Sequence, residues 1–334
     1  MKLIDNTKIN LGCLNTFLKK KPIFAAWHVT YRCNLRCKFC SFWKQPIDVS
    51  KELSVEQYES SIPKLLEMGV RVVNFAGGEP CIRKDLPEIS SKFVKDFIVV
   101  INSNGLLITE EYAEKLWGAG VDIINISLDF FDSSKHNYFR GSENAYSGAI
   151  RAMKILNKYK TKKGQKVAMQ AILSPQNLNE FEKMVALAQE LDVDFAFNPY
   201  RFGDHEVDMS FSNADLSFLY ELKNKYSHFI ATDYALEKTL EFVKKGETGV
   251  CGMGKYMLAI DPYGNVGPCE NMLKHSAGNI ITDSAEDVYQ KLLDIHNRHL
   301  CNKCLTRERS EIELLYDHVL SPKWIKEAML VKKS

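Results

Sequence analysis

Between residues 23 and 197, six apolar stretches alternate with stretches whose apolar residues recur at helical spacing. The apolar stretches are the continuous runs expected of strands that are buried on both faces. Such alternation implies a parallel sheet with right-handed helical crossovers. We therefore predict an α/β fold built as an open (β/α)6 partial barrel, with an open doubly wound sheet as the alternative. The predicted strands cover residues 23–29, 71–76, 97–101, 121–128, 167–173 and 193–197.

The helical stretches end at residues that commonly terminate helices. The first begins near residue 53 and stops at Gly69, because glycine readily adopts the left-handed conformation that ends a helix. Gly118 and Gly120 stop the third helix in the same way. The predicted helices cover residues 53–69, 86–95, 109–117, 145–159, 177–191, 214–225, 234–245, 284–298 and 311–333, the last of them broken near Pro322 and without evident chemistry.

Three cysteines follow the first predicted strand. Cys33, Cys37 and Cys40 are separated by three residues and then by two, on the kind of strand-end loop where α/β proteins place their chemistry. Three thiolates this close can converge on zinc or on an iron–sulfur cluster. Structural zinc usually takes four protein ligands, so three cysteines favour a [4Fe–4S] cluster with one iron open to a small molecule. A zinc loop, or three unrelated thiols, is the alternative.

The spacing C-x3-C-x-aromatic-C, with Phe39 as the aromatic residue, resembles the radical S-adenosylmethionine (SAM) superfamily. The resemblance covers residues 23–205. It implies that the amine and carboxylate of SAM chelate the open iron of a cluster bound by Cys33, Cys37 and Cys40. It also implies that an electron from the cluster cleaves SAM to a 5′-deoxyadenosyl radical, which abstracts a hydrogen from a substrate carbon.

The ends of the later strands carry further motifs of this family. Gly77-Gly78-Glu79-Pro80 matches the GGEP motif, for which the resemblance implies binding of the methionyl amine of SAM. Two glycines let backbone approach a ligand closely, which would leave their N–H and C=O groups for a polar head group. A carboxylate such as Asp129 suits ribose hydroxyls, and Arg140 suits the SAM carboxylate. The further candidates carried over from the family pattern are Ser103, Asn104, Ser127 and Gln170.

Two cysteines lie outside the cluster motifs. Cys81, directly after the GGEP motif, is predicted to be a buried apolar thiol, and its alternative role is to donate a hydrogen atom near the substrate. It is therefore the one weak candidate for a catalytic residue. Cys13 is predicted to be structural.

A second set of four cysteines lies near the C-terminus. Residues 256–268 read as strand, tight turn and strand, so a hairpin would bring Cys251 and Cys269 together, with Cys301 and Cys304 following a helix. Four thiolates complete a shell for zinc or for a [4Fe–4S] cluster. The set resembles the twitch domain, the smaller relative of the SPASM domain, which implies one auxiliary [4Fe–4S] cluster. Such a cluster could take an electron from the substrate and so support net oxidation.

These patterns suggest a division of the chain, which would place a small C-terminal α+β cluster-binding domain after the barrel. The predicted parts are an N-terminal extension (1–22), a radical SAM core (23–205), a helical connector (206–249) and a twitch-like auxiliary cluster domain (250–334). Within the extension, residues 14–21 form a short basic amphipathic stretch. We expect a capping helix with a solvated basic end, with contact to a membrane or partner as the alternative.

Charge and composition limit the partners and the compartment. The net charge of +2 gives no support to a nucleic-acid partner. No signal peptide and no apolar run of about 18 residues is present, so no transmembrane segment is expected. Cysteines at metal-ligand spacings in a leaderless chain favour the reducing cytoplasm over disulfides in a secreted protein.

The resemblance implies an oxygen-sensitive radical SAM enzyme, an oxidoreductase or maturase that receives electrons from a flavodoxin or ferredoxin. A small-molecule substrate is slightly favoured over a peptide of the ribosomally made, modified class and over a protein, as in sulfatase-type maturation. About 22 residues precede the core, too few for a leader-peptide recognition domain. A non-catalytic zinc or iron–sulfur protein is a different class of function, and the strand-end ligand set argues against it.

Overall fold

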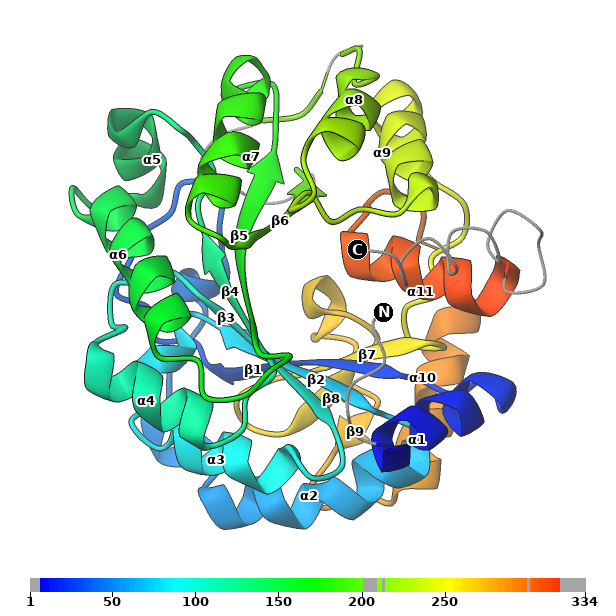
Figure 1. Ribbon diagram of the computed structural model, residues 1–334. Coiled ribbons are helices and arrows are strands. Elements are labelled where there is room, and N and C mark those ends of the chain that lie inside the picture. The colour runs from blue at the N-terminus through cyan, green and yellow to red at the C-terminus, as the bar shows by residue number, and fades with distance from the viewer. Residues whose placement is uncertain (1–6, 201–208, 212–213, 299–300, 319–334) are drawn as a thin grey trace.

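The computed structural model describes residues 7–200, 209–211, 214–298 and 301–318 (Figure 1). Its central element is one sheet of nine strands in the order β6-β5-β4-β3-β2-β1-β7-β8-β9. The pairs from β1 to β6 are all parallel, and each strand pairs with its neighbour in sequence, so the six strands curve into the open barrel that the alternation predicts. These strands are β1 (Phe24–Thr30), β2 (Val72–Gly77), β3 (Ile98–Ser103), β4 (Ile123–Ser127), β5 (Lys166–Leu173) and β6 (Asp194–Pro199).

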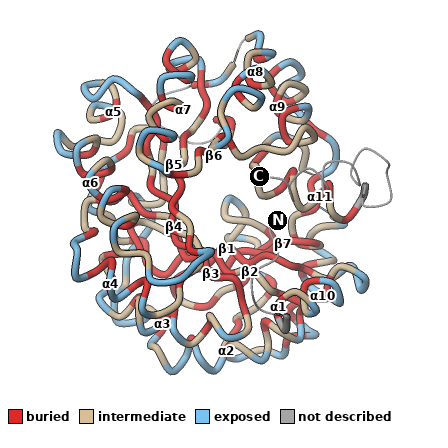
Figure 2. The backbone as a smooth tube through the Cα atoms, viewed as in Figure 1, coloured by how far each residue is buried: buried red, intermediate tan, exposed pale blue. Residues whose placement is uncertain are grey.

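Helices cover the outer face of the barrel, and their solvent side is the exposed rim in Figure 2. Ser54 caps α2 through a reciprocal capping box with Gln57, and Gly69 ends this helix in a left-handed conformation. The predicted stop is therefore confirmed. The helices of the barrel layer are α2 (Val55–Met68), α3 (Leu86–Phe93), α4 (Glu110–Gly118), α5 (Ser133–Arg140), α6 (Ala145–Lys158) and α7 (Phe181–Glu190).

The interior between the sheet and these helices is apolar and rich in aromatic rings. Trp27, Tyr58, Phe75 and Phe93 pack with ring centroids between 4.6 and 6.4 Å apart. All four side chains are fully buried. Burial of four large rings contributes on the order of 10 kcal/mol to the stability of this layer. The sheet and α2 and α3 therefore give the site a rigid base.

The C-terminal hairpin belongs to the same sheet as the barrel. As predicted, β7 (Met257–Ile260) and β8 (Asn265–Gly267) form an antiparallel pair around a turn, and β9 (Gly278–Asn279) extends it. The sequence did not indicate that β7 would pair in parallel with β1, from Phe24–Met257 to Trp27–Ile260. The hairpin thus closes the edge that β1 would otherwise expose.

The remaining helices lie beside this hairpin and the open side of the barrel (Figure 1). The predicted helix 214–225 is shorter than expected, and the C-terminal helix begins four residues before its predicted start and is described only to residue 318. None of the helices within the described residues has the length and apolar character needed to span a membrane. These helices are α1 (Thr7–Leu18), α8 (Phe218–Lys225), α9 (Asp233–Lys245), α10 (Ala285–Arg298) and α11 (Arg307–His318).

Candidate radical SAM active site

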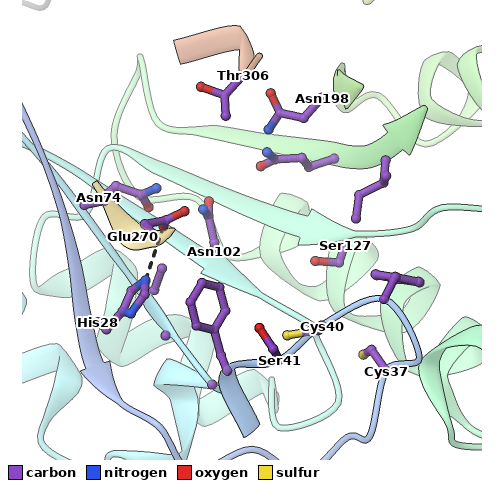
Figure 3. A pocket seen from close by; sticks show the side chains of 18 of the residues that line it. His28, Cys37, Cys40, Ser41, Asn74, Asn102, Ser127, Asn198, Glu270 and Thr306 are labelled. Atoms are coloured by element: carbon purple, nitrogen blue, oxygen red, sulfur yellow. Dashed lines mark hydrogen bonds and ion pairs between the residues drawn. The ribbon is translucent and has the colours of Figure 1, made fainter. Parts of the chain in front are cut away.

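The inner face of the barrel encloses a cavity of about 320 Å³, a size typical of pockets for small molecules. Figure 3 shows Cys37 and Cys40 on one side of it and His28, Asn74 and Glu270 on the other. Of the residues predicted to bind the first cluster or SAM, every one except Pro80 lines this cavity. The set comprises Cys33, Cys37, Phe39, Cys40, Gly77, Gly78, Glu79, Ser103, Asn104, Ser127, Asp129, Arg140 and Gln170.

The cysteine loop is held in shape by hydrogen bonds that involve the cysteines themselves. The Leu35 N–H donates to Cys33 Sγ at 3.4 Å, and Trp43 Nε1 donates to the Cys37 carbonyl at 3.2 Å. Burial raises the pKa of Cys33 to about 12 and that of Cys37 to about 11. Thiolates in this loop therefore need a cationic partner such as a metal centre to remain charged.

The two glycines of the GGEP motif lie against the backbone of the cysteine loop. Gly77 has φ +124°, and a Cβ on Gly78 would lie 2.2 Å from the Arg32 carbonyl oxygen. The Gly78 N–H donates to the Thr30 carbonyl and the Glu79 N–H to the Arg32 carbonyl, both at 2.8 Å. The expectation that the glycine amides are left for a ligand is thus wrong for the Gly78 N–H. The glycines are required because two chain segments pass so close together.

Glu79 ties the second and third strand ends to each other. One carboxylate oxygen accepts from the Cys81 N–H at 3.0 Å and from Ser103 Oγ at 2.8 Å, and the other accepts from the Asn104 N–H at 2.8 Å. Burial raises the pKa of Glu79, and these hydrogen bonds oppose the rise. Asn104 in turn donates to Asn34 of the cysteine loop at 2.8 Å. The three loops therefore form one connected network.

Asp129 and Arg140 contact each other. Asp129 Oδ2 lies 2.7 Å from Arg140 Nε and 2.6 Å from Nη2, while Oδ1 accepts from the Ile172 N–H at 3.0 Å. The guanidinium also lies over the ring of Phe39, 5.1 Å from its centroid, and Nη1 is 4.0 Å from Cys37 Sγ. The pair therefore places a cation beside the cysteine loop. The separate roles in binding ribose and carboxylate stay predictions.

The four C-terminal cysteines lie around one cavity, and among them are Cys251 and Cys269, which the predicted hairpin would bring together. Cys251, Cys269, Cys301 and Cys304 all line a second, smaller cavity. The Cys251 N–H donates to the Cys301 carbonyl at 2.8 Å, and a hydrogen bond from Cys304 lowers the pKa of Cys301. Cys269 lines both this cavity and the large one.

Comparison with known proteins assigns both cysteine sites to families. Residues 27–188 match the model of the radical SAM superfamily, and residues 251–305 match that of an iron–sulfur cluster-binding domain called SPASM. The chain contains a radical SAM domain, followed by a SPASM domain at its C-terminus. It is an enzyme of the class in which a radical SAM domain precedes a SPASM domain, and its cofactors are SAM and two [4Fe–4S] clusters. The predicted family, fold and cofactors are confirmed.

Its relatives differ in what they make. It is 33% identical to Fe-coproporphyrin III synthase of Methanosarcina barkeri over 56% of this chain and 45% of that protein. It is 27% identical to the subtilosin biosynthesis protein AlbA of Bacillus subtilis over 81% of this chain and 60% of that protein. The chain thus spans about half the length of these two relatives. The structure of Streptococcus suis SuiB bound to SAM superposes with a TM-score of 0.64 at 18% identity, covering 81% of this chain and 66% of SuiB.

The residues at the radical SAM site fit the cofactors of the family. Three thiols line one cavity beside Arg140. The carboxamide oxygen of buried Asn74 and the Nδ1 atom of buried His28 have no hydrogen-bond partner among the residues that the structure describes. Within the described residues, no three His, Cys, Asp or Glu side chains are arranged to hold a single metal ion. An iron–sulfur cluster makes a different demand, because each cysteine ligates its own iron.

The far side of the cavity carries polar residues that sequence reasoning missed. His28 on β1, Asn74 on β2, Asn102 on β3 and Asn198 on β6 lie there with Glu270, as Figure 3 shows. His28 is fully buried, and its Nε2 lies 3.2 Å from Glu270 Oε1. Polar residues inside strands that otherwise read as apolar were the available signal, since a buried polar side chain needs a partner.

The thiols outside the cluster motifs are buried and do not line this cavity. Cys81 is 1% exposed and lies 3.5 Å from Ser103 Oγ, and it is not among the residues that line the radical SAM cavity. Cys13 is 5% exposed and packs beneath the sheet. Cys81 is thus buried as predicted, and the buried position of Cys13 fits its predicted structural role.

One buried arginine supports the SPASM cysteines from α11. Arg309 donates to the carbonyls of Cys304 and Gly249, and its Nε lies 2.6 Å from Glu313 Oε1. Glu313 also accepts from the Gly252 N–H at 3.2 Å. The sequence predicts no chemistry for the C-terminal helix. In the structure, this helix stabilises the segments on which two SPASM cysteines lie.

Proposed function

We propose that this enzyme abstracts a hydrogen atom from a carbon of its substrate and oxidises that substrate with the help of the auxiliary cluster. When bound, the first cluster supplies the electron that cleaves SAM and so generates the radical that takes the hydrogen. In net oxidation, one further electron and one proton leave the substrate. The observation that carries the proposal is that Cys269 lines both the radical SAM cavity and the smaller cavity of the SPASM cysteines.

The roles of the chain's own residues follow from their positions. Cys33, Cys37 and Cys40 would hold the first cluster, and Cys251, Cys269, Cys301 and Cys304 would hold the auxiliary one. Glu79 would fix the loops around SAM, and Arg140 would place positive charge beside the cysteine loop and the carboxylate of SAM. A flavodoxin or ferredoxin would supply the electron, and the reducing cytoplasm is the compartment that we propose.

We infer a small-molecule substrate, because polar side chains from several strands line the side of the cavity opposite the first three cysteines. Fe-coproporphyrin III synthase is, by its name, a relative that acts on a small molecule. The second candidate is a peptide, which AlbA and SuiB favour, since one is named for bacteriocin biosynthesis and the other has been solved with its precursor peptide SuiA. We also propose the division into residues 1–22, 23–205, 206–249 and 250–334. It describes four sequence regions, of which 23–205 and 250–334 contribute the strands of the one sheet.

The test uses anaerobically purified and reconstituted protein. Reduction with dithionite in the presence of SAM should give 5′-deoxyadenosine and methionine, and metal analysis should give about eight irons per chain. Cys33→Ala should abolish SAM cleavage, whereas Cys81→Ala, which removes a buried thiol that does not line the cavity, should retain it. SAM cleavage by Cys33→Ala at the wild-type rate would refute the proposal. About four irons with one zinc would refute its auxiliary cluster.

A further inference from the structure

Helix α1 presents apolar side chains to opposite sides. Ile9 and Cys13 face inward and pack with Phe24, Tyr256 and other residues beneath the sheet. On its other side, the side chains of Leu11, Leu14 and Leu18 are 62%, 53% and 70% exposed. Spacings of three and four residues put these leucines on one face of the helix. They form the leucine stripe, three of the most exposed large apolar side chains of the described chain.

The leucine stripe ends at a run of lysines. Lys19 and Lys20 follow Leu18 directly and are exposed, and residues 7–21 contain no acidic side chain. Lys21 turns inward, where Nζ donates to the Glu67 carbonyl at 3.0 Å. An apolar helix face flanked by lysines is the pattern of helices that lie in a membrane interface, where the leucines enter the acyl boundary and the lysines contact anionic head groups.

The inner face of α1 fixes the helix so that the stripe faces outward. Thr16 Oγ1 donates to the Gly69 carbonyl at 2.6 Å, and the ring of Phe17 lies 5.5 Å from that of Tyr316. A peptide that folds only on a membrane must lose backbone entropy when it binds. Here the helix is already formed and oriented by the protein core, so the apolar face is available without that cost.

We propose that α1 docks this enzyme onto an anionic phospholipid surface through Leu11, Leu14 and Leu18, with Lys19 and Lys20 contacting the head groups. Charge favours an anionic phospholipid surface, rather than the C-terminal segment of this chain, as the partner of the leucine stripe. Residues 319–334, outside the described part, carry four lysines and one glutamate. They follow α11 in the sequence, and Tyr316 of α11 donates to the Lys21 carbonyl at 2.6 Å. Like charges disfavour its folding over the lysine end, whereas both segments suit an anionic surface.

The test is co-sedimentation of the full-length reconstituted protein with vesicles of phosphatidylcholine and phosphatidylglycerol. We expect binding that weakens as salt is raised, and at least fivefold weaker binding to vesicles of phosphatidylcholine alone. Lys19→Gln/Lys20→Gln should lower the affinity for the mixed vesicles about tenfold. Leu11→Asn/Leu14→Asn/Leu18→Asn should remove binding to both kinds of vesicle.

Controls distinguish loss of membrane binding from unfolding of the variants and from self-association of the protein. Val49→Asn changes an equally exposed apolar residue on another surface and should bind as the wild type does. Iron content and the thermal midpoint should be the same in all variants. Wild-type protein that stays in the supernatant, or a leucine variant that still sediments, would overturn the proposal. A wild-type dimer that ignores vesicles and becomes a monomer in the leucine variant would replace it with self-association.

Discussion

At the residue scale, the two glycines of the GGEP motif are fixed by the cysteine loop that passes over them. A Cβ at position 78 would meet the carbonyl oxygens of Arg32 and Tyr31 at 2.2 and 2.6 Å, and these are backbone atoms that can move only with the loop. We predict that Gly78→Ala lowers the free energy of unfolding by about 1–3 kcal/mol and abolishes SAM cleavage.

Gly118 in α4 is the matched control for this substitution. Apart from its two chain neighbours and the backbone of its own helix, no heavy atom of the described residues lies within 4 Å of the Cβ it would acquire. Gly118→Ala should therefore keep SAM cleavage and change stability by less than about 1 kcal/mol, in the stabilising direction. Denaturant unfolding and a 5′-deoxyadenosine assay measure both effects. Equal stability and activity of the two variants would show that the close approach is not needed.

His136 couples the stability of the site to pH. It is 1% exposed, and its Nδ1 accepts from the Asp129 N–H at 3.2 Å. Burial lowers the pKa of His136 from 6.5 to about 4, with Asp129 opposing this shift. Below pH 6.5, His136 becomes protonated in the unfolded chain but stays neutral in the folded chain until about pH 4. The free energy of unfolding should therefore fall by on the order of 3 kcal/mol as the pH is lowered through this window.

The variant His136→Asn tests this pH dependence, because Asn offers an acceptor oxygen and does not titrate. Its unfolding free energy should vary less between pH 6.5 and 4 than that of the wild type. Parallel pH profiles for the two proteins would assign the acid sensitivity to other groups.

At the element scale, α11 supports the auxiliary cysteines through Arg309, a guanidinium that is 1% exposed and bound to two carbonyls and to Glu313. We predict that Arg309→Met costs about 3–5 kcal/mol because it leaves the Glu313 carboxylate and these carbonyls without their donor. Iron should fall from about eight to about four per chain, with the SAM-dependent cluster retained. Full iron content in this variant would show that α11 does not hold the second cysteine set.

Elements with strong apolar periodicity could be predicted from the sequence, and those without it could not. All six barrel strands were found because their runs are apolar on both faces. Helix α5 was missed because His136 is its one buried residue among polar neighbours, so it has no apolar stripe. The pairing of β7 with β1 was also missed, since partners more than 200 residues apart in sequence leave no local pattern.

The site residues likewise fall into those that local sequence patterns predict and those that only the fold brings together. Its cysteines, glycines and strand-end residues could be found from spacing and motif, and all but Pro80 line the cavity. The contact of His28 with Glu270 could not be found, because each residue looks ordinary until the fold brings the SPASM segment across the barrel.

At the scale of the whole molecule, the radical SAM and SPASM parts share one sheet. Removing residues 250–334 would strip β7 from β1 and expose a long apolar strand edge. We predict that a chain ending at residue 249 aggregates or unfolds well below the thermal midpoint of the full chain. A soluble, folded 1–249 chain that binds about four irons would show instead that the two parts fold independently.

The claim on which the account depends is that Cys33, Cys37 and Cys40 hold a cluster with one iron open to SAM. Electron paramagnetic resonance of the reduced Cys269→Ala protein, with and without SAM, tests it most directly, because only the first cluster is expected in that variant. A reduced-cluster signal whose g-values change when SAM is added is the predicted result. A signal that is the same with and without SAM would contradict the account.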